Sequence, residues 1–597
     1  MFEFLIGIGE YLVAVLFLVC ALGVIGGAVL SVCARNALTT SSMFWLTAPG
    51  VGLGSFSIFT LMVTHLGSGI TTWNVTLLVA LCGVVLVALN RENFTRTIGQ
   101  TSLIVVCRLF GIFLLIGGVG LIPYIQLFII GRFPVDFFTT PTWTNNDLGA
   151  YLQMSTNLMQ KGLSDAHLIR GWNPAPQSAF DHPAVLSVLA GVSRLLGAMP
   201  YQIGLVLMSA ICIVCCLSTL ALVGHFGGQT ALRKTGLLVP AVIANPAIVS
   251  AVANYFLAQL QTLSLLLTIL ALTAIWLSSS NGFSGLIPIG ICFAASFMTS
   301  VETAVSLGPV MMGFGVILTQ SPGIKRVALL IATPVLAVVP LFALRTDFIV
   351  DQLRVLRRVS VGGIAGWQAN YTSLTALSGF APIQFGQPSI PNTRSIDFLI
   401  LIAIGVLISV LVRRERSLIR VVVPMLLIVF AVLAGIYRWG SNGYQTWKFI
   451  TTSAGIFLCL LLVLNSKIRE TSRAISLYLA LIIGATVSWS GFVWRDSVDS
   501  SWVSPDLSRV SRAIRAQDLD GVNVLLAPFF ETMAASVMVG SNAHMSSPTY
   551  EFPEGQPLYF PCTLTTKNRL DELQEGARII QAFGNYVLAG NAECGVP

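Results

Sequence analysis

Carboxylates and histidines gather in one polar stretch, residues 132–183, of a chain that is otherwise rich in apolar segments. They are Asp136, Asp147, Asp165, Asp181, His167 and His182. Such side chains are common general acids and bases in enzymes. The stretch follows an apolar segment, so it meets the membrane surface where that segment ends. We therefore expect the chemistry of the protein in this loop.

Asp147 stands at the predicted start of a helix in the run NNDLGAYLQMSTNLMQKG. Apolar residues follow helical spacing at Leu148, Tyr151, Leu152, Leu158 and Met159. This spacing predicts an amphipathic helix that lies on the membrane surface. Asn, Asn and Asp before such a run are also the residues that cap a helix. The two interpretations are compatible, because a capping turn also fixes a carboxylate at the mouth of a cavity.

The composition defines the class of protein that must position these residues. Charged residues make up 10% of the 597-residue chain, against roughly 25% in soluble domains. Apolar runs of roughly 17 to 30 residues recur along the chain, each long enough to cross a hydrocarbon core as a helix. The net charge of +8 is spread in short clusters between these runs, which excludes a nucleic-acid-binding patch. The chain is therefore predicted to be a helical polytopic membrane protein.

We predict about fourteen transmembrane helices. They lie near residues 5–33, 43–66, 73–90, 101–131, 203–225, 236–256, 259–278, 284–300, 303–319, 327–344, 397–412, 420–437, 448–465 and 474–493. Basic connections, among them 413–420 and 466–473, mark the cytoplasmic side, so the loops 132–183 and 345–397 are external. The shorter run 184–197 contains Arg194 and predicts an interfacial or re-entrant helix. The N-terminus is expected outside, on a helix that is retained.

The chain divides into three predicted parts, which are N-terminal helices in 1–100, a transmembrane core in 101–493 and an extracytoplasmic domain in 494–597. In the last part we expect strands near 522–527, 549–552 and 586–589 and helices near 531–539 and 568–583, which together indicate a small α/β domain. Cys562 and Cys594 are the two cysteines of this tail. A pair outside the cell is expected to be bridged, with free thiols as the alternative.

The order of elements resembles that of the GT-C glycosyltransferases. The matching pieces are an external loop with Asp147 and Tyr151, a surface helix that ends near Gly162 and Asp165, and His182-Pro183 before the run AVLSVLAGVSRLLG. The resemblance covers the loop, the surface helix and the succession of spans. Two features depart from the family. Three spans precede the one that normally comes first, and the acidic pair is not adjacent here, so Asp136 or Asp165 would have to supply a second carboxylate.

The resemblance implies a function. Enzymes of this family take a sugar from a polyprenyl-phosphate donor at the external leaflet, and the first-loop Asp is the catalytic base, a role carried here to Asp147. The acceptor would be an extracytoplasmic glycan, lipid or protein whose hydroxyl loses its proton as it attacks the anomeric carbon. Direct inversion needs no separate nucleophile. No cofactor is strictly required, although a divalent cation could balance the leaving phosphate, and no ligand motif identifies its site.

The phosphate of such a donor could be held in either of two places. In the second external loop, Arg354, Arg357 and Arg358 fall at helical spacing, and guanidinium groups suit phosphate oxygens. The alternative is a helix whose arginines face solvent or lipid headgroups.

The second place is the external connection YRWGSNGYQTWKF, which contains Arg438, Tyr444, Trp447 and Lys448. Similar loops with aromatic residues and a lysine occur in GT-C enzymes, although the aromatics could equally form an interfacial belt. Tyr151, His182, Tyr444 and Trp447 are the candidates for substrate binding. Glu302 lies at a predicted external turn, where a structural and a functional role are both open.

Three other functions stay open. A transporter or flippase of lipid-linked sugars would show repeated halves and charges near the middle of the bilayer, and the sequence shows no such halves and few such charges. An oligosaccharide ligase or polymerase would also expose Arg and His beside a lipid-linked donor, and a scaffold without catalysis would share the fold. The expected disulfide and the lack of eukaryotic retention signals favour a bacterial plasma membrane and an envelope glycan product.

Overall fold

The structure is a computed structural model of the chain. It describes residues 2–33, 43–65, 69–100, 146–159, 182–253, 256–279, 282–319, 323–344, 346–361, 369–370, 377, 384–385, 405, 418–439, 444–468, 473, 475–484, 504–517, 519, 521–526, 529–539, 543–545, 560–573, 577–590 and 594.

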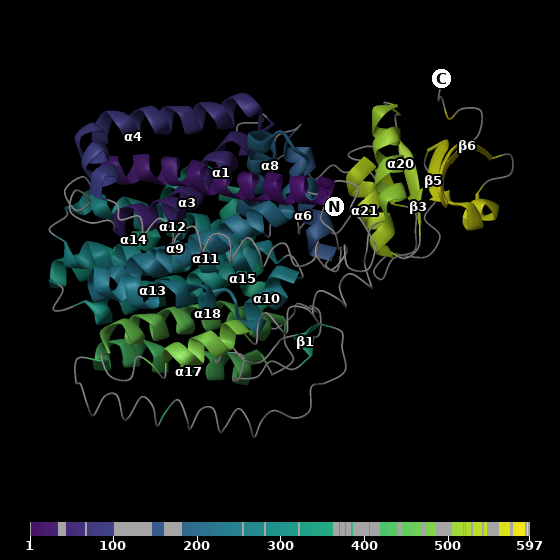
Figure 1. Ribbon diagram of the computed structural model, residues 1–597. Helices are drawn as coiled ribbons and strands as arrows, with labels where there is room; N and C mark the ends of the chain where they lie inside the picture. The colour runs from purple at the N-terminus through teal and green to yellow at the C-terminus, as the bar shows by residue number, and fades with distance from the viewer. Residues whose placement is uncertain are drawn as a thin grey trace.

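Long apolar helices lie side by side in one bundle (Figure 1). They are α1 (Phe2–Cys33), α3 (Met43–His65), α4 (Thr72–Gln100), α9 (Pro200–Thr235), α11 (Leu257–Ser278), α13 (Val301–Leu318), α14 (Ile324–Leu344), α17 (Ile419–Trp439) and α18 (Tyr444–Lys467). Within the described ranges, these nine are long and apolar enough to cross a membrane. The polytopic helical fold is thereby confirmed. The predicted total of about fourteen stays untested, since 101–131 and nearly all of 397–412 lie outside those ranges.

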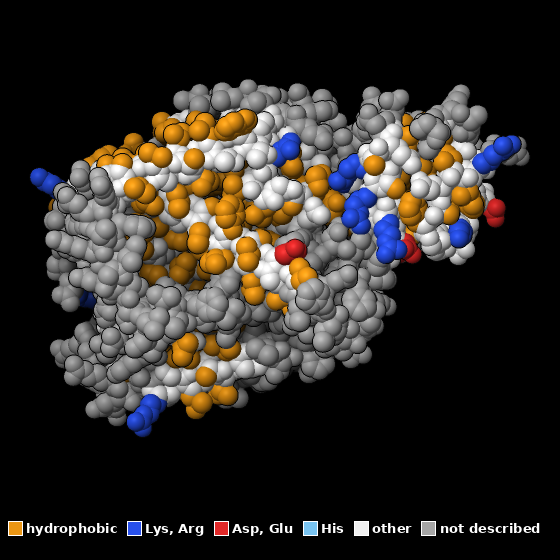
Figure 2. All heavy atoms as spheres, turned by 45° about the horizontal axis from the view of Figure 1, so that its top comes forward, with side chains coloured by type: hydrophobic (Ala, Val, Ile, Leu, Met, Phe, Trp, Pro, Cys, Tyr) orange, Lys and Arg blue, Asp and Glu red, His pale blue; other side chains and the backbone are white. Residues whose placement is uncertain are grey.

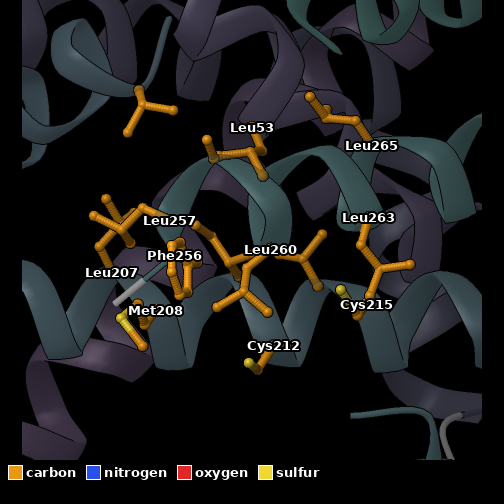
Figure 3. Packing of buried hydrophobic residues seen from close by; sticks show 14 of the residues in the cluster. Leu53, Leu207, Met208, Cys212, Cys215, Phe256, Leu257, Leu260, Leu263 and Leu265 are labelled. Carbon is orange, nitrogen blue, oxygen red and sulfur yellow. The ribbon is translucent and has the colours of Figure 1, made fainter. Parts of the chain in front are cut away.

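The bundle has a buried centre and a periphery. The most apolar windows of α9 and α11 are 94% buried and that of α18 is 89% buried, against 11% for α4 and 17% for α14. Leucines of α11 lie against Leu207, Met208, Cys212 and Cys215 of α9 (Figure 3). Apolar side chains of α4 and α14 are exposed instead, and Figure 2 shows apolar side chains spread over one face of the bundle. Such surfaces are stable in lipid, so α4 and α14 lie at the edge of the bundle.

The single span predicted for 236–256 is wrong. A 3-10 helix η2 (Gly236–Val242) and a short helix α10 (Pro246–Ala253) take its place. Pro246 lacks the amide hydrogen that would continue a helix, and it stands at the first position of α10. The Asn245 side chain donates to Val242 O at 2.9 Å and accepts from the amide of Ile248 at 3.1 Å, which satisfies backbone groups at the break.

Three shorter helices accompany the bundle, α12 (Ile287–Thr299) inside it and α6 (Asn146–Leu158) and α8 (Pro183–Leu196) at one end (Figure 1). We refer to this end as the α6 end. The side chains of α6 from Tyr151 to Leu158 are all buried, so neighbouring elements cover this helix on more than its apolar face. Helix α8 covers one side of α6, and α21 of the C-terminal domain covers another.

An amphipathic helix, α15 (Thr346–Val361), follows α14 and packs against α13 and α14. A two-stranded ribbon, β1 (Ala369–Asn370) with β2 (Gln384–Phe385), lies further along the second long loop.

The C-terminal domain is a mixed five-stranded sheet with two helices. Its elements are α20 (Pro505–Ala516), β3 (Val522–Leu525), α21 (Phe529–Val539), β4 (Ala543–Met545), β5 (Cys562–Thr566), η6 (Lys567–Glu572), β6 (Arg578–Phe583) and β7 (Tyr586–Gly590). The strand order is β4-β3-β5-β7-β6, with parallel pairs on one side of β5 and antiparallel pairs on the other. The helices lie between the sheet and the α6 end of the bundle (Figure 1). The small α/β domain is thereby confirmed.

The helix predicted for 568–583 is wrong, because η6 and then strand β6 occupy these residues. Gly584, with φ of 58°, and Asn585 form a two-residue turn between paired residues Phe583 and Tyr586. Such a turn needs left-handed conformations, and it joins β6 and β7 as a hairpin. The strand predicted for 549–552 lies outside the described residues.

Cys562 and Cys594 form a disulfide with their Cα atoms 5.1 Å apart. The division of the chain at residues 100 and 493 stays a prediction.

Candidate active site

A buried ion pair lies near the start of two helices at the α6 end. The ammonium of Lys448, in the first turns of α18, is 3.3 Å from Oε1 of Glu302, in the first turn of α13. Their side chains are 8% and 10% exposed. Buried charges need partners, because removing them from water is costly. The second carboxylate oxygen, Glu302 Oε2, is buried and has no hydrogen-bond partner among the described residues.

His182 stands beside this pair, just before α8. Its Nδ1 donates a hydrogen bond to the carbonyl of Thr299, at the end of α12, over 2.5 Å. Since a carbonyl oxygen can only accept, this bond fixes a proton on Nδ1. The imidazole also interacts electrostatically with the carboxylate of Glu302. Tyr151 of α6 meets the imidazole edge-to-face, with the ring centres 5.8 Å apart. His182 therefore connects α6 to the ion pair.

Gln261 and Trp447 complete this layer. Gln261 of α11 donates to Ser57 Oγ at 3.0 Å and to Thr299 Oγ1 at 3.2 Å. Trp447 of α18 is fully buried, and its ring centre is 4.3 Å from that of Phe256, which precedes α11. These contacts join α3, α11, α12 and α18 at the α6 end. We name Tyr151, His182, Gln261, Thr299, Glu302, Trp447 and Lys448 the polar layer.

Helix α6 is fixed in place at its C-terminal end. Arg194 of α8 donates to the carbonyl of Ile70 at 2.8 Å and to that of Met159 at 2.6 Å. The amide of Ile70 in turn donates to Leu158 O at 2.9 Å. A cation at this end also complements the helix dipole. Asp147, the second residue of α6, thus belongs to a helix held by α8 and by the segment before α4.

The predicted site residues divide into three sets. The structure brings Tyr151, His182, Trp447 and Lys448 together in the polar layer. It places Arg354 and Arg357 on an exposed side of α15 and Arg438, also exposed, near the end of α17. Asp147, Tyr444 and Arg358 take places in α6, α18 and α15. Asp136 and Asp165 lie outside the described residues.

The sequence did not point to Gln261 or Thr299 of the polar layer. It also did not indicate that Glu302 pairs with Lys448. Gln261 and Thr299 lie inside apolar runs and carry no motif. Glu302 stands out as an acidic residue between apolar segments, and such a residue is expected to be paired in a membrane protein. Its partner Lys448 is 146 residues further along the chain, so only the fold reveals the pair.

Within the described ranges, no group of three or more His, Cys, Asp or Glu side chains is arranged as metal ligands. A divalent cation near the donor phosphate stays a prediction.

No protein-family model matches the chain, and no curated protein matches it. Among solved structures, the chain is similar to ArnT from Cupriavidus metallidurans bound to undecaprenyl phosphate, with a TM-score of 0.49 and 11% identity over 81% of this chain and 98% of ArnT. For ArnT in the apo state, the TM-score is 0.46 and the identity is 10%, over 80% of this chain and 97% of ArnT. For the Archaeoglobus fulgidus oligosaccharyltransferase in the apo form, the TM-score is 0.40 and the identity is 12%, over 74% of this chain and 65% of that protein. Identities of 10–12% are too low to carry residue roles between chains.

Proposed function

We propose that this protein is a membrane glycosyltransferase that moves a sugar from a polyprenyl-phosphate donor to an extracytoplasmic glycan, lipid or protein. One observation carries the proposal. A buried layer with a cation, a carboxylate and an imidazole lies beside α6, the helix that contains Asp147 in its first turn. Proton transfer and charge balance, the two needs of the reaction, are thus served at one end of the bundle.

In the proposed reaction, the acceptor oxygen forms a bond to the anomeric carbon as the bond from that carbon to the phosphate oxygen breaks. Asp147 takes the proton of the acceptor hydroxyl. The leaving group is polyprenyl phosphate, and the ammonium of Lys448 balances its charge in a poorly solvated setting, where such an interaction is stronger than in water. One displacement inverts the anomeric configuration. Asp136 or Asp165 supplies a second carboxylate where one is needed.

The four arginines have a different role in this proposal. Arg354, Arg357 and Arg358 on α15 and Arg438 on α17 meet phosphate groups as the lipid approaches, since guanidinium forks bind phosphate oxygens. The aromatic rings of Tyr151, Tyr444 and Trp447, with His182, line the path of the sugar or the prenyl chain. The α6 end of the bundle faces the outside of a bacterial plasma membrane. The C-terminal domain receives the acceptor.

Replacing Asp147 with Asn tests the proposed base. The full chain in proteoliposomes is given a panel of synthetic polyprenyl-phosphate sugars, and sugar transfer to candidate acceptors is measured. Asp147→Asn keeps the fold and should reduce transfer by about 10²–10⁴-fold, the usual contribution of a general base. Asp571→Asn, which removes an exposed carboxylate from η6, is the matched control and should transfer normally. Normal transfer by Asp147→Asn would exclude Asp147 as the base.

A transporter of lipid-linked sugars is the second candidate, and two observations favour it. The chain between α9 and α11 is broken into η2 and α10, and broken helices are typical of transporters. Hydroxyls of Thr262, Thr451 and Ser453 are buried with no hydrogen-bond partner in the described part of the chain. The same proteoliposomes decide between the two functions. If a labelled polyprenyl-phosphate sugar crosses the bilayer and no sugar is transferred, the result supports the transporter. If the protein accepts only pyrophosphate-linked oligosaccharides as donors, the result indicates a ligase or polymerase.

A further inference from the structure

Glu302 has no role in the reaction described above, yet it is the partner of the cation on which that reaction depends. We propose that Glu302 is a positioning residue, which holds the ammonium group of Lys448 where it meets the phosphate of the lipid donor. The inference rests on the proposed function, and it adds a residue that the family resemblance does not assign.

The chemistry of lysine explains why a positioning residue is needed. A lysine ammonium is a point charge at the end of a flexible chain, whereas arginine presents a rigid fork. The 3.3 Å contact with Glu302 Oε1 fixes the ammonium of Lys448 in a layer where both side chains are nearly buried. The carboxylate of Glu302 therefore holds the ammonium group in place before the donor arrives.

The backbone around Glu302 is well held. Helix α13 begins after Ser300, whose hydroxyl donates to Thr303 Oγ1 at 3.1 Å, and the carbonyl of the preceding Thr299 accepts from His182. Through His182 the carboxylate is linked to α6, the helix of the proposed base. The two groups that must act together, Asp147 and Lys448, are thus both tied to the turn between α12 and α13.

The state of the second carboxylate oxygen argues against a purely structural pair. A buried ion pair stabilises a fold only when the remaining hydrogen-bonding capacity of both groups is also satisfied. Glu302 Oε2 is buried and has no hydrogen-bond partner among the described residues. Such an oxygen suits a group that arrives with the substrate, and a hydroxyl of the donor sugar has the right chemistry to donate to it.

Binding of undecaprenyl phosphate to the full chain in nanodiscs, with undecaprenol as the lipid lacking phosphate, tests this role. Glu302→Gln should weaken the binding of undecaprenyl phosphate at least tenfold and leave that of undecaprenol unchanged. Glu10→Gln, which removes an exposed carboxylate from α1, is the matched control and should bind both lipids normally. If the Glu302→Gln variant keeps the wild-type preference for undecaprenyl phosphate over undecaprenol, the positioning role of Glu302 is overturned and the proposed function is not. A wild-type protein that does not distinguish the two lipids overturns the proposed function, and this inference with it.

Exchanging the two charges separates positioning from stability. The double variant Glu302→Lys with Lys448→Glu keeps the ion pair but moves the cation from α18 to α13. We expect it to recover the thermal stability lost in either single variant without recovering undecaprenyl phosphate binding. Recovery of both would show that the pair is structural and overturn the inference.

Discussion

Burial of a single carboxyl group makes the C-terminal domain sensitive to pH. Glu531 lies in the first turn of α21 and is half-buried. Burial raises the pKa of its carboxyl group, and a hydrogen bond with the Tyr586 hydroxyl opposes part of that rise. Burial and the neighbouring Glu531 together raise the pKa of Tyr586 to about 12, while a hydrogen bond with Ser504 lowers it. Burial outweighs the hydrogen bond, so the folded domain is most stable when Glu531 carries its proton.

The sign of the pH dependence follows from this shift. The folded domain keeps the Glu531 proton to a higher pH than the unfolded chain, whose carboxyl titrates near 4.5. The stabilisation is therefore complete below that pH and is lost as the pH rises through the folded pKa. Proteolysis of the C-terminal domain in the full chain should become faster for wild type than for Glu531→Gln as the pH rises from about 4.5 to 7. The ratio of the two rates cancels the pH dependence of the protease, and a ratio that does not change with pH would contradict the prediction.

Types of residue were easier to predict than their partners. A lysine beside aromatics and a histidine before a proline made Lys448 and His182 candidates from the sequence. The hydrogen bond from His182 to Thr299, 117 residues further on, depends on packing of α8 against α12 that no local pattern contains. Gln261 and Thr299 look like ordinary polar residues of apolar helices until the fold gives them neighbours.

At the level of elements, helices α1 and α3 cross at an unusually short distance. A Cβ atom added at Gly26 of α1 would lie 1.8 Å from Ala48 O, and one added at Gly52 of α3 would lie 1.8 Å from Leu22 O. Membrane helices associate through such small residues, because close backbones gain van der Waals contact where no hydrophobic driving force is available. The crossing fixes α3, whose Ser57 supports Gln261 of the polar layer.

Gly26→Ala should destabilise the protein by about 1–3 kcal/mol, the usual cost of forcing extra volume into a filled contact. Helix propensity opposes this change, since alanine favours a helix over glycine by up to ~1 kcal/mol. Gly9→Ala in the same helix controls for propensity, because nothing lies within 4 Å of its added Cβ atom. Thermal unfolding in detergent is the measurement. Equal midpoints for the two variants would show that the crossing can relax at no cost.

Hydropathy predicted where most helices lie, but not where they break. It predicted α1, α3, α11, α17 and α18 to within a few residues, because each is a continuous apolar run between polar segments. The run 236–256 is equally apolar, yet Pro240 and Pro246 interrupt it, and an average over the window hides single prolines. Similarly, the charged residues of 568–583 suggested a helix, whereas the structure pairs β6 with β7 in a hairpin that turns at Gly584 and Asn585.

At the level of the whole molecule, the positions of basic residues bear on how the bundle is oriented in the membrane. At the end opposite α6, Arg326 donates to the carbonyls of Leu277 and Ser279, and the ammonium of Lys467 lies 4.7 Å from the ring centre of Phe226. Basic residues at membrane helix ends favour the cytoplasmic side. The orientation in which the polar layer and the C-terminal domain lie outside stays a prediction, since basic side chains also gather where the domain meets the bundle (Figure 2). The N-terminus lies at the same end (Figure 1).

The C-terminal domain meets the bundle where α6 is held. Lys and Arg side chains gather there on the face shown in Figure 2. The guanidinium of Arg515, on α20, donates to the carbonyl of Met538 at the end of α21. It also lies over the ring of Tyr201, near the start of α9, at 5.6 Å from the ring centre. Since α21 packs against α6, one side chain joins the helices of the domain to the bundle beside the helix of Asp147.

Loss of this contact should therefore loosen α6 without disturbing the centre of the bundle. Arg515→Ala removes a cation–π contact and a charge-assisted hydrogen bond, together worth about 2–4 kcal/mol, part of which holds α21 on α6. Backbone amides of α6 should exchange hydrogen at least tenfold faster, whereas those of α18 should not change. Arg509→Ala on the same helix is the control, because Arg509 is exposed and makes a surface ion pair with Asp506 of little energetic value. Unchanged exchange in α6 would mean that the contacts of Arg515 do not help to hold the helix.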